Sequence, residues 1–264
     1  MASHLLDTAD GAQLEVLVDG RAGDPGLVLL PSSQRDSLDF DELVQRLVGH
    51  GFRVLRPQPR GMGRSSPPPP DFTLHTLAAD VAQAIEAVVA GPALVAGHAF
   101  GHFIARVTDL DHPARVRGVI VLAGAARSFP PGLSQALDIA ADPTQARERR
   151  LQSLRKAFFA PGNDASVWLE GWHPQLRELY RRAAAVPAKD RWWPVTHAPI
   201  LDLQGAQDPW RPPATRDELK DCLGEERVTV RTIAGASHAL IPEQPAAVAD
   251  AIAAWAGTLR PLSP

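Results

Sequence analysis

The segment Gly97-His98-Ala99-Phe100-Gly101 has the spacing of a tight turn that presents a nucleophilic side chain. It follows a short apolar run and precedes helix-like residues, and catalytic turns of this kind lie between a strand and a helix. A nucleophile is expected at the central position, but Ala99 carries no nucleophilic atom. The segment therefore predicts a catalytic turn from which the attacking group is missing.

Two later segments carry an acid and a base. Asp208 follows the apolar run 200–203, and His238 follows the strand-like run 227–233. In a catalytic triad, an imidazole takes the proton of the nucleophile while a carboxylate orients the imidazole and stabilises its charged form. The chain order of turn, acid and histidine is one of the known orders of such a triad. We therefore predict that Asp208 and His238 are catalytic and that Ala99 occupies the position of the nucleophile.

The rest of the chain predicts the elements that position these residues. Residues 4–18 have a hairpin pattern, and over 27–123 apolar runs alternate with amphipathic helical segments. This alternation predicts an α/β fold with a mostly parallel sheet and helices on both faces, in which ligands bind at the carboxyl ends of the strands. It resumes over 200–259 with strands at 200–203 and 227–233 and helices at 213–222 and 245–259.

Residues 127–197 interrupt this alternation, because the segment reads as helical and has no strand-like run. We predict an α/β core formed by residues 1–126 and 198–264, with a helical lid over 127–197 inserted after the sixth strand. The lid contains four of the six tryptophans. Aromatic side chains bury large areas in helix packing as well as in binding sites, so both roles remain open for them. As candidate substrate contacts we take Ser32, His98, His102, Trp168, Trp172, Trp192 and Trp193.

Composition narrows the classes of partner. The 264 residues carry a formal net charge of −3 and one cysteine, so a clustered basic face for nucleic acid and an internal disulfide are not expected. We find no metal-ligand spacing and no phosphate-binding loop, and we expect neither a metal nor another cofactor. The start lacks the features of a signal peptide, and no apolar run approaches membrane-spanning length. We expect a cytoplasmic bacterial protein, monomeric or homodimeric, that acts away from membranes on a small hydrophobic or aromatic substrate.

Four motifs in this order resemble the α/β-hydrolase superfamily, and the resemblance covers nearly the whole chain. They are Arg60-Gly61-Met62-Gly63-Arg64-Ser65, Gly97–Gly101, Asp208-Pro209 and Gly235-Ala236-Ser237-His238. The chain is similar to bacterial members with a Gly-His-Ala-Phe-Gly turn. The resemblance implies the α/β-hydrolase fold, Asp208 and His238 as acid and base, and an oxyanion hole from the backbone N–H groups of Ser33 and Phe100. The loop that usually begins with His-Gly in the family begins here with Pro31-Ser32.

Ala99 leaves several interpretations open. One interpretation is an engineered replacement of a serine or aspartate that traps a substrate, a second is a natural subgroup with this turn, and a third is a catalytically inactive binding protein. Without a nucleophile at position 99, the His238–Asp208 pair is still able to activate water directly. A displaced nucleophile at Ser32, Ser33 or Ser128 is a further alternative. The leading prediction is hydrolysis of an ester, a lactone or a related carbonyl compound. The alternatives are non-catalytic binding of a small molecule and a cofactor-independent lyase or isomerase reaction.

Overall fold

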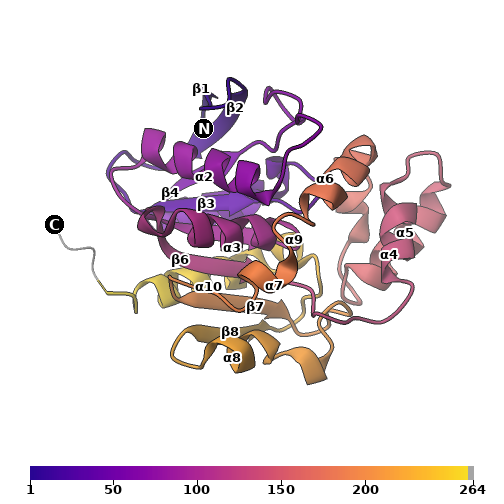
Figure 1. Ribbon diagram of the computed structural model, residues 1–264. Helices are drawn as coiled ribbons and strands as arrows, with labels where there is room; N and C mark the ends of the chain where they lie inside the picture. Colours follow the sequence, from indigo (N-terminus) through magenta and orange to yellow (C-terminus); the bar gives the residue numbers. More distant parts are fainter. Residues whose placement is uncertain (261–264) are drawn as a thin grey trace.

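An eight-stranded sheet runs through the protein, as the computed structural model shows (Figure 1). The structure describes residues 1–260. The strand order is β1-β2-β4-β3-β5-β6-β7-β8; β2 pairs antiparallel with both neighbours, and every other pair is parallel. The strands are β1 (Ala2–Asp7), β2 (Gln13–Asp19), β3 (Gly26–Leu30), β4 (Arg53–Pro57), β5 (Ala93–His98), β6 (Val116–Leu122), β7 (Ile200–Gly205) and β8 (Val228–Ile233).

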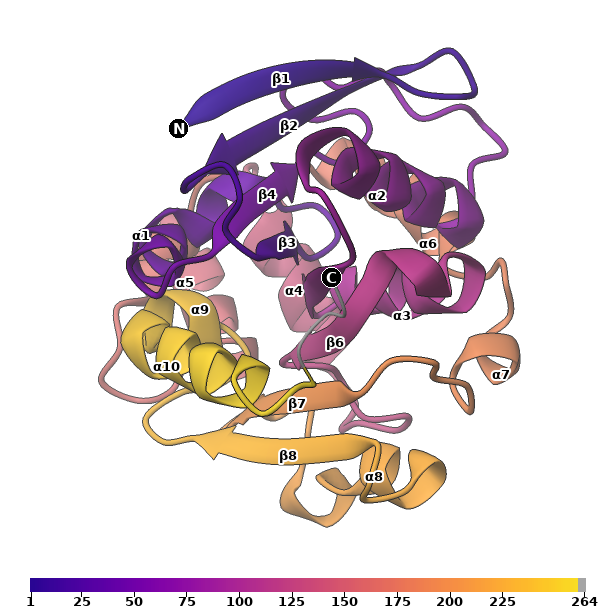
Figure 2. The ribbon, with the colours of Figure 1, turned by 90° about the vertical axis from the view of Figure 1, so that its left-hand side faces the viewer.

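Helices cover both faces of this sheet, with α1, α9 and α10 on one side and α2 and α3 on the other (Figure 2). The helices are α1 (Asp41–Gly49), α2 (Leu74–Val88), α3 (Gly101–Asp111), α4 (Leu133–Ala141), α5 (Arg147–Ala157), α6 (Arg177–Ala183), α7 (Lys189–Trp192), α8 (Glu218–Leu223), α9 (Leu240–Glu243) and α10 (Pro245–Ala256). None of these helices in the described part of the chain is long and apolar enough to cross a membrane.

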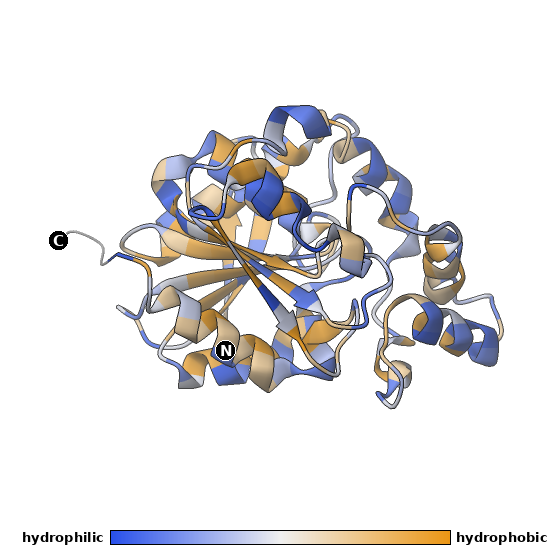
Figure 3. Ribbon diagram, turned by 90° about the horizontal axis from the view of Figure 1, so that it is seen from below, coloured by the Kyte–Doolittle hydropathy of each residue, from blue (hydrophilic) through white to orange (hydrophobic). Residues whose placement is uncertain are grey.

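The central strands are buried along their whole length, because successive side chains point to opposite faces and helices pack on both. On β5, for example, Val95 joins the core beneath α2 and α3, whereas Leu94 joins the core beneath α1 and α10. Figure 3 shows the strands as mostly hydrophobic and the outer helix faces as largely hydrophilic. Because β3 to β8 run parallel, their carboxyl ends lie at the same edge of the sheet, and the loops that follow these ends carry the candidate residues.

The segment between β6 and β7 packs in two different ways. Helices α4 and α5 lie to one side of the sheet (Figure 1) and form a separate apolar cluster with Trp168 and Trp210. By contrast, Tyr180 of α6 and Trp192 of α7 belong to the main core on the α2–α3 face. Only the first half of this insertion therefore has its own hydrophobic interior.

The predicted fold class is confirmed, with differences at the ends of elements. The predicted helix over 213–222 begins as a single 3-10 turn at Pro213–Thr215, and α8 starts at Glu218. The last helix ends at Ala256 rather than 259. The short helix α9 after the candidate histidine was not predicted, because four residues are too few to show a helical period. Residues 261–264 of the predicted core lie outside the described residues.

Candidate active site

The turn around Ala99 has the geometry that the glycine spacing predicts. Ala99 has a φ of 45°, in the left-handed region that non-glycine residues rarely adopt. A Cβ added at Gly97 would lie 2.2 Å from the backbone of Gly101, and one added at Gly101 would lie 2.3 Å from the Leu30 carbonyl oxygen. Both glycines are therefore required for β5, α3 and the loop after β3 to approach this closely.

His238 and Asp208 meet at the same edge of the sheet. His238 Nδ1 lies 2.9 Å from Asp208 Oδ2, and both residues are only 4% exposed. The second carboxylate oxygen of Asp208 accepts a hydrogen bond of 2.8 Å from the backbone N–H of Trp210. Because an ionised carboxylate only accepts hydrogen bonds, Nδ1 carries the ring proton and Nε2 is left as the acceptor of the neutral imidazole.

A cavity of about 160 Å³ brings half of the twelve candidate residues together. Its polar wall comes from loops that follow β3, β5 and β8, and its apolar wall includes residues of the insertion. It is lined by Ser32, Ser33, Ala99, Phe100, His102, Phe103, Ala125, Leu137, Phe158, Trp210 and His238. Of the alternative nucleophiles, Ser32 and Ser33 line this cavity and Ser128 does not.

The predicted oxyanion donors lie beside Ala99. Ser33 and Phe100 both line the cavity, and the backbone N–H of neither donates a hydrogen bond within residues 1–260. The close contact of Gly101 with Leu30 and Pro31 holds the loop after β3 against the turn. Two unpaired N–H groups near a reacting carbonyl are the usual donors to an oxyanion, so this arrangement is chemically able to stabilise one.

His98 lies behind the cavity rather than on its wall. Its Nε2 donates a hydrogen bond of 2.8 Å to the backbone carbonyl of His238, and its ring packs against those of His238 and Trp168. Burial, together with the nearby charge sites of His238 and Arg35, lowers the pKa of His98 to about 3. His98 therefore stays neutral and supports the loop that carries His238.

His102 does line the cavity, from the first turn of α3. Its Nδ1 donates to the carbonyl oxygen of Ala99, and the residue is 2% exposed. Burial, reinforced by the positive charges of Arg106, Lys189 and Arg211, holds its pKa well below the ordinary value of 6.5. His102 thus offers the cavity a neutral ring.

The four candidate tryptophans do not line the cavity, although all are buried or half-buried. Trp168 and Trp172 pack on the guanidinium of Arg35, whose carbon lies 4.9 and 4.7 Å from the ring centroids, and so attach the insertion to the loop after β3. The backbone carbonyls of Trp192 and Trp193 accept hydrogen bonds from Arg106 of α3. The four tryptophans therefore pack outside the cavity and support the segments that form its walls.

Phe158 and Trp210 are the aromatic residues that reach the predicted base, and neither was among the candidates. Their ring centroids lie 5.7 and 5.3 Å from that of His238, and the Trp210 indole N–H donates a 2.7 Å hydrogen bond to the Ala157 carbonyl. The sequence gives one indication that Trp210 lies at the site, because Trp210 follows Asp208 by two residues at the end of a strand. No sequence feature distinguishes Phe158 from the other aromatic residues, because these occur throughout the insertion.

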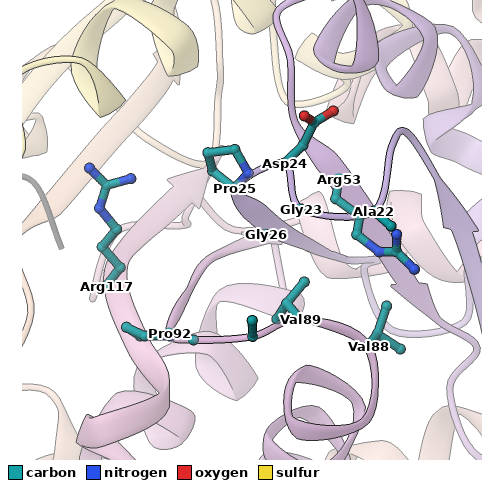
Figure 4. A pocket seen from close by; sticks show the side chains of 12 residues that line it. Ala22, Gly23, Asp24, Pro25, Gly26, Arg53, Val88, Val89, Pro92 and Arg117 are labelled. Carbon is teal, nitrogen blue, oxygen red and sulfur yellow. The ribbon is translucent and has the colours of Figure 1, made fainter. Parts of the chain in front are cut away.

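A larger hollow of about 490 Å³ lies at the opposite end of the sheet, where β3, β4 and β6 begin. Its arginines, Arg53 and Arg117, lie at opposite sides of it and do not point toward a common centre (Figure 4). It contains no histidine, serine or cysteine, so its one carboxylate, Asp24, has no histidine or nucleophilic partner there. Within residues 1–260, no group of three or more potential ligands among histidine, cysteine, aspartate and glutamate is placed to hold a metal ion.

Comparison with known proteins finds the same scaffold. Residues 27–251 match the alpha/beta hydrolase family. The chain is 31% identical over 121 residues to epoxide hydrolase A of Mycobacterium tuberculosis, which is 45% of this chain and 37% of that protein. It is 34% identical over 113 residues to rhodomycin D methylesterase DnrP of Streptomyces peucetius, which is 40% of this chain and 37% of that protein.

Among solved structures, a hydrolase from Pseudomonas aeruginosa superposes with a TM-score of 0.77. The superposition covers 97% of this chain and 98% of that one at 23% sequence identity. At this identity the likeness concerns the fold alone. The two curated relatives are matched over little more than a third of their length, so their reactions do not transfer directly.

Proposed function

The chain belongs to the alpha/beta hydrolase family, and from this membership we propose that it hydrolyses an ester, a lactone or a related carbonyl compound of a hydrophobic small molecule. The observation that carries the proposal is the 2.9 Å contact of His238 with Asp208 beside the cavity that also holds Ala99. A carboxylate at Nδ1 stabilises the imidazolium that forms when Nε2 takes a proton. The pair is therefore equipped as a general base.

Because Ala99 has no nucleophilic atom, the proposed reaction uses water directly. His238 Nε2 takes one proton from the water molecule as the water oxygen forms a bond to the carbonyl carbon of the substrate. The π electron pair of that carbonyl moves onto the carbonyl oxygen. The N–H groups of Ser33 and Phe100 stabilise that oxyanion. When the intermediate collapses, the bond to the leaving oxygen breaks and His238 returns the proton to it.

The insertion supports the substrate side of the proposal. Leu137 of α4 and Phe158, which follows α5, contribute apolar surface to the cavity. We propose that these two helices form the lid over the site. A cavity of about 160 Å³ is close to the roughly 150 Å³ that accommodates benzene in an engineered protein. An acyl or leaving group of about one aromatic ring fits that space.

Ligand binding without turnover is the second candidate function, and Ala99 is the observation that favours it. Loss of the serine from a working protease triad lowers kcat by roughly 10⁶. A chain without that group retains a cavity and hydrogen-bond donors, which suffice for binding.

The test compares the native chain with His238→Ala, Asp208→Asn and Ala99→Ser on short p-nitrophenyl esters. We expect measurable native turnover, a fall of at least about 100-fold for His238→Ala, and a smaller fall for Asp208→Asn. His112→Asn, at the far end of α3, is the matched histidine control and should match the native rate. Mass spectrometry should detect an acyl-enzyme only in Ala99→Ser.

Two outcomes would contradict direct hydrolysis. Native turnover equal to that of buffer, with ligand binding retained, would favour the binding protein. Turnover that survives His238→Ala unchanged would remove His238 from the reaction and place the base elsewhere.

A further inference from the structure

His102 is a polar side chain on the cavity wall that the proposed hydrolysis does not use. Its ring packs against those of Phe103 and Trp192, with centroid distances of 4.6 and 6.3 Å. A Cβ added at Gly124 would lie 3.3 Å from His102 Cε1, so the glycine leaves room for the ring. The imidazole is therefore held in place by α3, α7 and the loop after β6.

The hydrogen bond of His102 determines which of its nitrogens bears the proton. Nδ1 faces the carbonyl oxygen of Ala99, and a carbonyl only accepts hydrogen bonds, so Nδ1 is protonated. The ring is neutral because it is buried and because Arg106, Lys189 and Arg211 oppose a further positive charge. Nε2 consequently carries a lone pair and acts only as an acceptor.

His102 and His238 thus differ in the group that accepts the hydrogen bond from Nδ1, which we call the anchor, and therefore in whether the ring can become charged. The anchor of His238 is a carboxylate, which stabilises a charged ring during proton transfer, whereas the anchor of His102 is a neutral carbonyl. His102 Nε2 has no hydrogen-bond partner within residues 1–260, since the contact with Ala99 is the ring's one hydrogen bond there. His102 is suited to accepting a hydrogen bond and poorly suited to taking a proton.

Although the hydroxyls of Ser32 and Ser33 also line the cavity, no group within residues 1–260 donates a hydrogen bond to His102 Nε2. Phe100, Phe103 and Leu137 are apolar, and the indole N–H of Trp210 already donates to the Ala157 carbonyl. A ligand that fills the cavity without a donor of its own leaves a buried acceptor unpaired, which lowers its affinity by about tenfold or more. A site built to hydrogen-bond a hydroxyl therefore rejects analogues that lack it.

We propose that His102 is a specificity-determining residue whose Nε2 accepts a hydrogen bond from a hydroxyl group of the substrate, so that the site prefers phenolic compounds to their O-methyl ethers. The proposal rests on the proposed function in placing the substrate in this cavity. A phenol suits the site for two reasons. Its ring matches the volume and the aromatic walls, and the positive charges of Arg106, Lys189 and Arg211 favour a polarised phenolic oxygen.

The experiment measures the dissociation constants of phenol and anisole by NMR titration of the full chain at pH 7. We expect the native protein to bind phenol about tenfold more tightly than anisole. His102→Asn keeps an amide N–H near the position of Nδ1 for the Ala99 carbonyl but lacks the distal acceptor, and its preference should fall to about one. His102→Gln places an amide oxygen near the position of Nε2 and should recover part of the preference.

His112→Asn, at the residue that follows α3, serves as the control and should retain the tenfold preference. An affinity of His102→Asn for anisole that equals or exceeds the native value shows that the cavity is intact, because the variant has no acceptor for anisole to leave unpaired. A native preference below twofold overturns the proposal, whether or not the variants fold. Retention of the preference in His102→Asn, or its loss in His238→Ala, also overturns it, because the hydroxyl would then be bound elsewhere.

The two proposals fail separately. A native chain that binds phenol selectively but hydrolyses no ester contradicts hydrolysis and leaves the role of His102 intact. A chain that hydrolyses esters without preferring the hydroxylated ligand contradicts the role of His102 and leaves hydrolysis intact.

Discussion

Ala99 has a strained backbone conformation at the position where we predict a nucleophile, and its side chain carries no reactive atom. A non-glycine residue in the left-handed region costs about 1–2 kcal/mol, and Ala99, with a φ of 45°, is held there by its surroundings. Its N–H donates to the Leu122 carbonyl at 2.9 Å, and its carbonyl accepts from His102. The strained backbone conformation of Ala99 thus directs its N–H to Leu122 and its carbonyl to His102, although the side chain is only a methyl group.

The role of His98 can be tested through the loop that it supports. His98→Leu leaves the His238 carbonyl without its 2.8 Å donor, and an unsatisfied buried group costs about 1–3 kcal/mol. We expect kcat for ester hydrolysis to fall about tenfold or more with little change in KM. His98→Gln, which returns an N–H near the same position, should recover part of kcat. A native kcat in His98→Leu would show that this hydrogen bond does not position the base.

At the scale of elements, the turn between β5 and α3 depends on its two glycines. A Cβ at Gly97 would overlap the Gly101 backbone, and backbone atoms yield less readily than a flexible side chain. We expect Gly97→Ala to lower the free energy of unfolding by about 3 kcal/mol or more, as large overpacking changes do. Urea denaturation followed by circular dichroism measures this.

Gly49 is the matched control for that change. It ends α1, and an added Cβ there meets no atom within 4 Å. Gly49→Ala should leave stability unchanged or raise it by up to about 1 kcal/mol, because alanine favours the helix and restricts the unfolded chain. Equal effects of the two substitutions would contradict the close contact at the turn.

The arginine-glycine segment after β4 has a structural role in this arrangement. Arg60 donates to Asp80 of α2 and to Asp10 of the β1–β2 turn, and its carbonyl accepts from the Tyr180 hydroxyl of α6. These bonds tie three elements to one loop. Arg60 lies outside the lining of the candidate cavity, so this motif supports the fold around the site.

At the scale of the whole molecule, buried neutral histidines make stability depend on pH. The pKa of His98 is about 3 in the folded state, against about 6.5 in the unfolded chain. Below pH 6.5 the unfolded chain therefore binds more protons than the folded one, and stability falls as the pH is lowered toward 3. His98 alone should contribute a loss of about 2 kcal/mol between pH 7 and pH 5.

Urea denaturation of the native chain and of His98→Gln at pH 7 and pH 5 measures this contribution. Burial raises the carboxyl pKa values of Asp80 and Asp202, which acts in the opposite direction, so the difference between the two chains isolates His98. The native chain should lose more stability than the variant by about 2 kcal/mol. An equal loss in both would show that His98 is protonated in the folded state or that its pKa is not lowered.

The sequence by itself determined the fold class and the approximate bounds of the strands. Alternation of buried runs with amphipathic segments is a local pattern, and it requires a parallel sheet whose carboxyl ends meet at one edge. The spacing of Gly97 and Gly101 likewise predicts a tight turn, because the turn depends only on residues that are close together in the sequence. For the same reason the chain order placed position 99, Asp208 and His238 near that edge before any contact was known.

Only the tertiary structure decided which aromatic residues face the cavity and which hydrogen bond orients each histidine. Trp168 and Trp210 are both buried tryptophans, yet the first packs on Arg35 and the second on His238. These contacts join residues far apart in the chain, and no local period encodes them. His98 and His102 flank the same alanine, and their different roles follow from which distant groups pack around each ring.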